Sequence, residues 1–190
     1  MSSHFYAMMS RMKNIQRWGL MRNTRPENLS EHTLEVAFIA HALAIIKNRR
    51  FGGNVDQNAV AVAAMFHDTS EIITGDMPTP IKYYNADIKN VYKEIEGIAQ
   101  NRLIGLLPED LRDDFVPAYN PDSETARLVK AADKISALIK CIEERNSGNT
   151  EFSSAEKSTL EAIKEMNMPE ADMFLDEFLS SYSLTLDELK

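Results

Sequence analysis

The stretch SEHTLEVAFIAHALAIIKNRR, from Ser30 to Arg50, decides the fold class of this chain. Its apolar residues follow a helical period rather than the alternation that marks a half-buried strand. Ser30 is a favourable N-cap residue, and Gly52 and Gly53 stop the pattern at the other end. The sequence therefore predicts one long helix that begins near Ser30 and ends before Gly52.

The same helical period dominates the chain on both sides of this stretch. We expect further helices over about 5–15, 56–74, 86–107 and 123–145, and one or two more in the tail with a break near 167–169. The proline-punctuated segment 108–121 is predicted to be a loop. No segment alternates convincingly enough to be a strand, and no repeat or linker divides the 190 residues. The prediction is an all-α fold, a single compact helical bundle over residues 1–190.

Composition and charge narrow the class of protein. Hydrophobic residues make up 44% and charged residues 26%, with 7 Gly and 7 Pro, which is ordinary globular composition tilted toward helix. The net charge of -8 argues against binding a nucleic acid polymer, although a metal ion would still allow a small anionic substrate. Cys141 is the one cysteine, and the N-terminal residues resemble neither a signal peptide nor a membrane span. We expect a soluble, cytoplasmic protein that does not enter membranes.

Polar residues interrupt an apolar stretch at MFHDTSEIITGDMPTP, residues 65–80. On a helix, His67 and Asp68 point about 100° apart and can hold one ion, and Glu71 lies one turn further on the same side. The plainer alternative is that His67 caps a carbonyl and Asp68 pairs with a lysine. A His-Asp pair alone has too little specificity to decide between these interpretations.

Two further residues on other predicted helices favour a metal site. His32 lies in the first turn of the helix that begins near Ser30, and Asp133 interrupts the apolar run LVKAADKISALIK, where a lone buried carboxylate is destabilising. With His67 and Asp68 they form a plausible ligand set for a divalent transition metal such as Co, Mn, Zn, Fe, Ni or Cu. Four protein ligands leave room for the water that catalysis needs. His41 lies near 180° around the helix from His32 and cannot face the same ion.

The order His32, His67-Asp68, Asp133 resembles the H…HD…D signature of the HD-domain metal-dependent phosphohydrolases. Three collinear blocks, RWGLMRNTRPENLSEHTLEVA, AMFHDTSEIITGDMPTPIKYYN and KAADKISALIKCIEE, are similar to those of the bacterial 5′-deoxynucleotidases in that superfamily. The resemblance implies an all-helical HD domain, a homodimer and a divalent metal. It also implies that the enzyme removes the 5′-phosphate from deoxyribonucleoside monophosphates.

The resemblance also implies roles for individual residues. Asp68 and Glu71 match catalytic carboxylates, and Arg17 and Trp18 match a pair that contacts the phosphate and the sugar. Taken alone, Arg17 is equally consistent with a surface arginine, whereas core packing is the favoured interpretation of Trp18. Gly19, where a proline is expected, and Met77 depart from the family pattern at the edge of the pocket. The implied metal ligands are His32, His67, Asp68 and Asp133, and the implied substrate-binding residues are Arg17, Trp18, His32, Asp68, Asp76, Met77, Pro78, Thr79 and Asp133.

Two other functions remain open on the sequence. The first is another HD-type phosphohydrolase that acts on a nucleoside triphosphate, a cyclic nucleotide or an alarmone. A triphosphate needs a larger basic pocket, and the basic residues near the motifs are mainly Arg17, Arg22, Arg25 and Lys82. The second is a non-enzymatic helical module, but a structural metal site is typically closed by cysteines, and Cys141 alone cannot supply one. Neither the metal nor the preferred base has a sequence signature.

Overall fold

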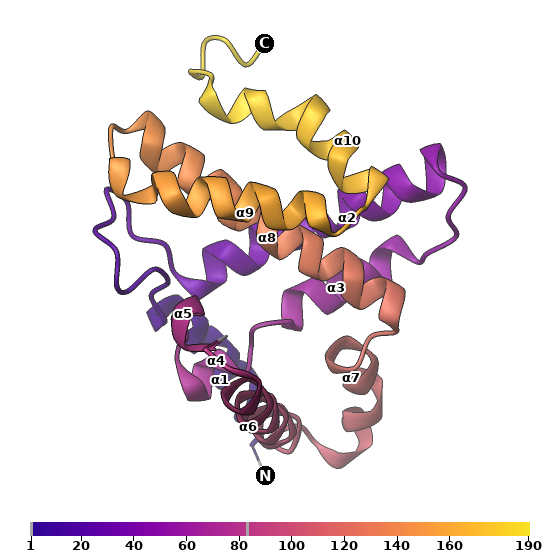
Figure 1. The fold of residues 1–190 in the computed structure, drawn as a ribbon. Helices are drawn as coiled ribbons and strands as arrows, with labels where there is room; N and C mark the ends of the chain where they lie inside the picture. The colour runs from indigo at the N-terminus through magenta and orange to yellow at the C-terminus, as the bar shows by residue number, and fades with distance from the viewer. Residues whose placement is uncertain (1, 83) are drawn as a thin grey trace.

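All regular elements in the described part of the chain are helices, so the predicted all-α class is confirmed (Figure 1). The computed structural model describes residues 2–82 and 84–190, and only the backbone of Thr79. Residues Gln16 and Asn28 form an isolated antiparallel bridge. The α-helices are α1 Phe5–Met9, α2 Leu29–Arg50, α3 Gln57–Phe66, α4 Glu71–Thr74, α5 Thr79–Lys82, α6 Ala86–Ile104, α7 Arg112–Tyr119, α8 Ser123–Asn146, α9 Ser153–Glu165 and α10 Pro169–Phe178. Short 3-10 turns η1 Ser10–Asn14, η2 Glu109–Leu111, η3 Thr150–Phe152 and η4 Leu179–Ser183 lie between or after them.

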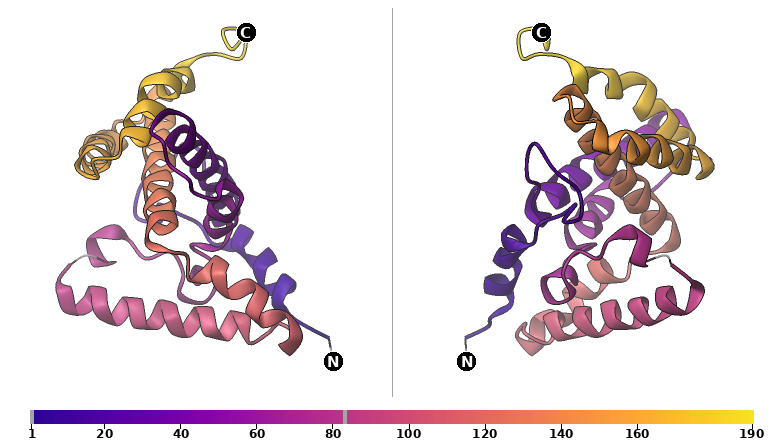
Figure 2. Two further views of the ribbon diagram at one scale, coloured as in Figure 1. Left: turned by 90° about the vertical axis from the view of Figure 1, so that its right-hand side faces the viewer. Right: turned by 60° about the vertical axis from the view of Figure 1, so that its left-hand side comes forward.

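The core lies where α2, α3 and α8 pack together (Figure 2). Alanines on α2 and α3, such as Ala40 and Ala64, are fully buried and let the helix axes approach closely. Larger side chains such as Leu43, Leu128 and Ile135 fill the remaining space. Each such Leu or Ile contributes about 1.5–3 kcal/mol on burial. The helices that carry the polar motifs are therefore held rigidly against one another.

The long helix predicted to begin near Ser30 begins at Leu29, because Asn28 and not Ser30 is its N-cap. The Asn28 Oδ1 atom accepts from the backbone N–H of Ser30 at 3.0 Å and of Glu31 at 3.1 Å. The Glu31 carboxylate accepts in return from the Asn28 N–H at 3.2 Å, which completes a capping box. A cap of this kind is worth about 1 kcal/mol, and it fixes the first turn of α2, where His32 lies.

The single helix predicted over 56–74 is wrong, because α3 ends at Phe66 and α4 begins at Glu71. Side chains in the intervening turn take the carbonyls that a continuous helix would use. His67 Nδ1 lies 2.7 Å from the Ala64 carbonyl oxygen, and Thr69 Oγ1 donates to the Phe66 carbonyl at 2.8 Å. Side-chain hydrogen bonds of this type compete with the helical ladder. The His-Asp pair therefore lies in a turn and not on a helix.

The segment 108–121, predicted as a loop, contains η2 and the helix α7. Pro117 lies inside α7, but tertiary packing overrides it. Phe115 makes edge-to-face ring contacts with Phe5 and Phe66, at centroid distances of 5.2 and 5.8 Å. Aromatic pairs of this geometry are favourable beyond their buried area.

Three methionines near the N-terminus pack against the rest of the protein. Met12 is buried, and Met8 and Met9 pack against the cluster around Phe5. By length and composition α2 could cross a membrane, but 56% of its most apolar window is buried inside the protein. Its role in this structure is that of the core helix.

Candidate active site

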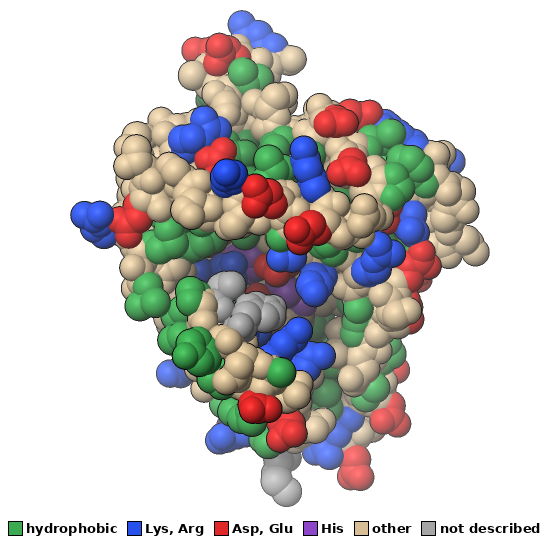
Figure 3. All heavy atoms as spheres, viewed as in Figure 1, with side chains coloured by type: hydrophobic (Ala, Val, Ile, Leu, Met, Phe, Trp, Pro, Cys, Tyr) green, Lys and Arg blue, Asp and Glu red, His purple; other side chains and the backbone are tan. Residues whose placement is uncertain are grey.

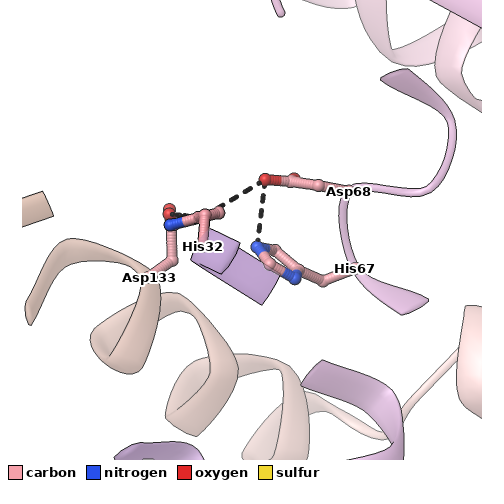
Figure 4. A group of neighbouring side chains, drawn as sticks. All are labelled: His32, His67, Asp68 and Asp133. Atoms are coloured by element: carbon pink, nitrogen blue, oxygen red, sulfur yellow. Dashed lines mark ion pairs between the residues drawn. The ribbon is translucent and has the colours of Figure 1, made fainter. Parts of the chain in front are cut away.

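Two histidines and two aspartates from three parts of the chain converge on one point (Figure 4). His32 comes from α2, His67 and Asp68 from the turn after α3, and Asp133 from α8. One ligand atom from each lies within 4.8 Å of all the others. The structure thus brings together the four residues that the sequence predicts as metal ligands. His41 is not part of this group among the described residues.

The contacts inside the cluster run from ring nitrogens to carboxylate oxygens. His32 Nε2 lies 3.2 Å from Asp133 Oδ1 and 3.5 Å from Asp68 Oδ2. His67 Nε2 lies 3.1 Å from the same Asp68 oxygen. Despite these short distances, the Nε2 atoms of His32 and His67 have no hydrogen-bond partner among the described residues. Two buried ring nitrogens are left pointing at a common centre, which is the arrangement that a cation satisfies.

The other ring nitrogen of each histidine fixes the tautomer. His67 Nδ1 faces the Ala64 carbonyl, which can only accept, so Nδ1 carries the proton. His32 Nδ1 lies 3.1 Å from Ser136 Oγ, which itself donates to Glu35 Oε2 at 2.6 Å. The hydroxyl therefore accepts from Nδ1–H, and the lone pair of both rings remains on Nε2. Metal-binding histidines are commonly oriented in this way, so the donor set fits a divalent ion.

The two aspartates make the centre of the cluster attractive to positive charge. Burial lowers the pKa of His67, but the Asp68 charge outweighs burial and raises this pKa to about 9. Burial raises the pKa of Asp68, but His67 and His32 hold it well below its usual range. A field that favours protons on buried imidazoles also favours a divalent cation between them.

Glu71 is buried at the start of α4 and its Oε2 atom has no hydrogen-bond partner among the described residues. Burial, followed by the negative charges of Asp68 and Asp76, raises its pKa to about 9. A carboxyl group of this kind can hold a proton at neutral pH and release it when positive charge comes near. Glu71 lies outside the four-residue cluster, so the structure separates it from the candidate ligands.

Arg17 reaches the cluster from the segment before α2. Its NH1 atom lies 3.6 Å from Asp68 Oδ2, and its guanidinium is largely buried. One oxygen, Glu27 Oε2, accepts from both Arg17 Nε at 3.2 Å and Trp18 Nε1 at 2.7 Å. The Trp18 ring is half-buried, packs 5.3 Å from the Phe152 ring, and its backbone has a φ of 59°. Glu27 therefore fixes both side chains together.

The segment that carries Arg17 and Trp18 is anchored to α8. Glu144 Oε2 accepts from the Thr24 backbone N–H at 2.9 Å and from Thr24 Oγ1 at 2.7 Å. Lys140 donates to the Arg25 carbonyl at 2.6 Å and pairs with Glu144. This buried ion pair holds a segment that has no regular secondary structure of its own.

The segment after α4 forms another edge of the site. Gly75 ends α4 with a φ of 74°, which favours glycine, and its N–H donates to the Glu71 carbonyl at 2.8 Å. Asp76, Met77 and Pro78 follow and are half-buried, and burial raises the pKa of Asp76 although Arg17 opposes this. The side chain of Thr79, the fourth residue predicted in this segment, lies outside the described residues. At Gly19 an added Cβ would meet nothing within 4 Å, so packing does not require this glycine.

A cavity of about 460 Å³ opens beside the cluster, with His67 and Asp133 in its lining. Of the basic residues expected near the motifs, Lys82 lines this cavity, whereas Arg22 pairs with Glu151 and Arg25 with Glu31 outside it. The lysines that line it come from α5, α6 and α8 and are Lys82, Lys89, Lys93, Lys130 and Lys134. Figure 3 shows histidine at the bottom of a hollow with Lys and Arg side chains around it.

Sequence reasoning missed Glu27, Ser136, Glu35 and most of these lysines. Ser136 gave a weak signal, because it is a polar residue in the apolar run of α8, three positions after Asp133. Glu27 lies in an irregular segment, where no periodicity connects it to Arg17.

Comparison with known proteins identifies the family. The family model described as 5′-deoxynucleotidase YfbR-like matches residues 4–182. The chain belongs to the YfbR-like 5′-deoxynucleotidase family. It is 49% identical over 190 residues to a 5′-deoxynucleotidase of Vibrio parahaemolyticus, covering 98% of each chain. It is 51% identical over 191 residues to one of Pectobacterium atrosepticum, covering 98% of this chain and 96% of that relative.

Solved structures agree with this YfbR-like assignment at the level of the fold. An HD-domain phosphohydrolase from Listeria innocua superposes with a TM-score of 0.82 at 22% identity, covering 94% of this chain and 88% of that one. An HD phosphohydrolase from cyanophage S-2L, bound to dA and one catalytic Zn²⁺, superposes with a TM-score of 0.67 at 21% identity, covering 94% and 96%. The predicted HD-domain fold and 5′-deoxynucleotidase family are confirmed.

Proposed function

We propose that the protein hydrolyses deoxyribonucleoside 5′-monophosphates to deoxyribonucleosides and phosphate, with a divalent transition metal held by His32, His67, Asp68 and Asp133. One observation carries this proposal. Two buried imidazoles present unpartnered Nε2 atoms to two carboxylates, and a buried arginine lies 3.6 Å from one of those carboxylates. Such a site can hold a cation and an anion side by side, which is what a phosphate monoester requires.

The metal, when bound, supplies the charge that polarises the phosphoryl group and lowers the pKa of water. The protein side chains supply the rest. Asp68 orients the attacking water, since its Oδ2 atom faces both histidines of the cluster and Arg17. Arg17 holds two phosphate oxygens with its planar guanidinium. Glu71 has a raised pKa and lies next to the cluster, so it is suited to protonate the leaving 5′-oxygen.

The sugar and the base are proposed to lie toward Trp18 and the segment Asp76, Met77, Pro78 and Thr79. An indole held by Glu27 is rigid, because its N–H is engaged at 2.7 Å. A rigid ring packed against C2′ excludes the additional hydroxyl of a ribonucleotide sterically. His32 and Asp133 border the same space from the metal side. We infer selectivity for the deoxy sugar from this arrangement.

The identity of the metal is proposed only as a class. Mixed imidazole and carboxylate ligands suit Co, Mn, Zn, Fe, Ni or Cu, and affinity alone does not select among them. The Zn²⁺ named for the cyanophage protein belongs to that set. Availability in the cell decides the occupant.

We further propose that the protein works as a cytoplasmic homodimer, and that neither a nucleic acid polymer nor a membrane is its partner. An apolar stripe on α2 supports self-association. Leu34, Phe38 and Ile45 share one face of that helix and are 53%, 68% and 36% exposed. Phe38→Glu is expected to shift the mass measured by analytical ultracentrifugation from dimer to monomer, and an unchanged mass would contradict this interface.

Phosphate release from a panel of nucleoside mono-, di- and triphosphates, with Mn²⁺, Co²⁺ or Mg²⁺, tests the function. We expect the fastest release from deoxyribonucleoside monophosphates with a transition metal. The lysine-lined cavity makes a triphosphate phosphohydrolase the second candidate, because basic groups can hold additional phosphates. Faster turnover of dATP than of dAMP would favour that alternative and overturn the proposal.

A further inference from the structure

The cavity beside the candidate metal cluster concentrates positive charge in a chain whose net charge is -8. Its lining comes mainly from α6 and α8, with further residues from α3 and α7. Figure 1 shows α6 near the bottom of the molecule and α8 above it. His67 and Asp133 belong to its lining, so the cavity leads directly to the cluster. Its volume of about 460 Å³ is within the range of small-ligand sites.

The lysines form two short rows on the two helices. Lys89 and Lys93 are one helical turn apart on α6, and Lys130 and Lys134 are one turn apart on α8. Like charges at this spacing repel each other and destabilise a helix. The two lysines within each row therefore do not stabilise their helix electrostatically. An anion in the cavity between them would relieve the repulsion in both.

Acidic groups in the lining do not cancel this charge. Glu96 is engaged with Lys82 at 2.9 Å, and Lys82 also lies 4.7 Å from the centre of the Tyr92 ring. Asp133 faces His32 in the cluster. Lys93, Lys130 and Lys134 form no ion pair with any described residue. The cavity therefore keeps an excess of positive charge that is directed at whatever enters it.

We propose that this lysine-lined cavity is an anion-binding vestibule, which draws the phosphate dianion of the substrate to the metal cluster and holds orthophosphate after hydrolysis. The inference rests on the proposed function, because it names how that substrate class reaches the site. Lysine suits the task, since an ammonium on a flexible stem attracts a phosphate without fixing its orientation. Arg17 then supplies the oriented contact. A cavity lined by charges of one sign raises the local concentration and the association rate of an oppositely charged ligand by roughly 10- to 1,000-fold.

The double variant Lys93→Gln/Lys134→Gln removes one charge from each wall. The matched control is Lys157→Gln, because Lys157 is exposed on α9 and does not line the cavity. At low ionic strength we expect the double variant to raise KM for dAMP roughly 5- to 20-fold, with kcat within about twofold. The difference should shrink as salt is raised to about 0.3 M, where screening acts over a few ångströms. Metal content should equal that of the wild type.

Orthophosphate binding to the metal-loaded proteins is measured by isothermal titration calorimetry, which needs no turnover. This measurement distinguishes failure of the vestibule from failure of the proposed function. A weaker orthophosphate affinity in the double variant, with the control unchanged, supports the vestibule even if the wild type releases no phosphate from dAMP. In that case only the proposed function fails. If KM, its salt dependence and the orthophosphate affinity of the double variant all match those of Lys157→Gln, the vestibule is refuted.

Discussion

Replacing Ser136 with alanine tests how the His32 ring is oriented for metal binding. Ser136 is fully buried, and its hydroxyl connects His32 Nδ1, at 3.1 Å, to the Glu35 carboxylate, at 2.6 Å. Alanine removes only that oxygen. It leaves the Nδ1–H of His32 without an acceptor and the Glu35 oxygen without a donor.

Two effects of different size follow from this change. A buried polar group left without its partner lowers the free energy of unfolding by about 1–3 kcal/mol. Loss of the group that orients a ligating histidine weakens metal binding by roughly 10- to 100-fold, or about 1.4–2.7 kcal/mol. The second effect arises because the His32 proton can then move to Nε2, the nitrogen that faces Asp133 and Asp68.

The assay is competition for Co²⁺ between the protein and a chromogenic chelator, which yields the metal dissociation constant without any substrate. Thr125→Ala is the control, because Thr125 is buried on the same helix and its hydroxyl bonds to Asp122 at 2.7 Å and to no other described residue. It should lose stability without losing metal affinity. A Ser136→Ala dissociation constant within about twofold of the wild type would refute the orienting role.

Three other expectations concern the chemistry and the frame of the site. Glu71→Ala should retain the metal but reduce kcat by roughly two to four orders of magnitude. Elemental analysis and a phosphatase assay measure the two quantities, and loss of the metal in this variant would show that Glu71 is a ligand. Trp18→Ala should narrow the ratio of kcat/KM for dAMP over AMP, chiefly by improving the ribonucleotide, from a preference of about a hundredfold or more; an unchanged ratio would return Trp18 to a packing role. Burial raises the pKa of Glu144, but hydrogen bonds from Lys140, Thr24 and Asn149 outweigh burial and lower it. Its stabilising contribution is therefore complete above the unfolded pKa of about 4.3 and is lost as the pH falls below that value. Urea unfolding of Glu144→Gln should show lower stability at pH 7 and a shallower loss in acid than the wild type, and parallel pH profiles would contradict this role.

The cluster of candidate ligands could be predicted from the sequence because residue chemistry carries it. Imidazoles and carboxylates in apolar helices are unusual enough to suggest an ion, and the three blocks around them identify the family. The turn at His67 could not be predicted from periodicity, since the apolar pattern continues through it. The helix ends there because Thr69 and His67 bond to backbone carbonyls, which is a local competition that the hydrophobic pattern does not record.

The lysine rows show a different limit. The four-residue spacing of Lys89 and Lys93, and of Lys130 and Lys134, is visible in the sequence. What the sequence does not show is that α6 and α8 lie on either side of one cavity, because no motif couples these two helices. At Pro117 the sequence predicted a loop where the structure has the helix α7. The packing of Phe115 sustains this helix despite the proline.

The oxygen of Glu27 that is shared by Arg17 and Trp18 has an evolutionary consequence. With the proposed roles, one acceptor supports both the hold on the phosphate and the fit to the sugar. A substitution at position 27 then perturbs affinity and sugar choice in the same step. Descendants of this enzyme that come to accept ribonucleotides are therefore expected to change at Trp18 or its ring contacts and to keep Glu27, because only that route separates the two properties.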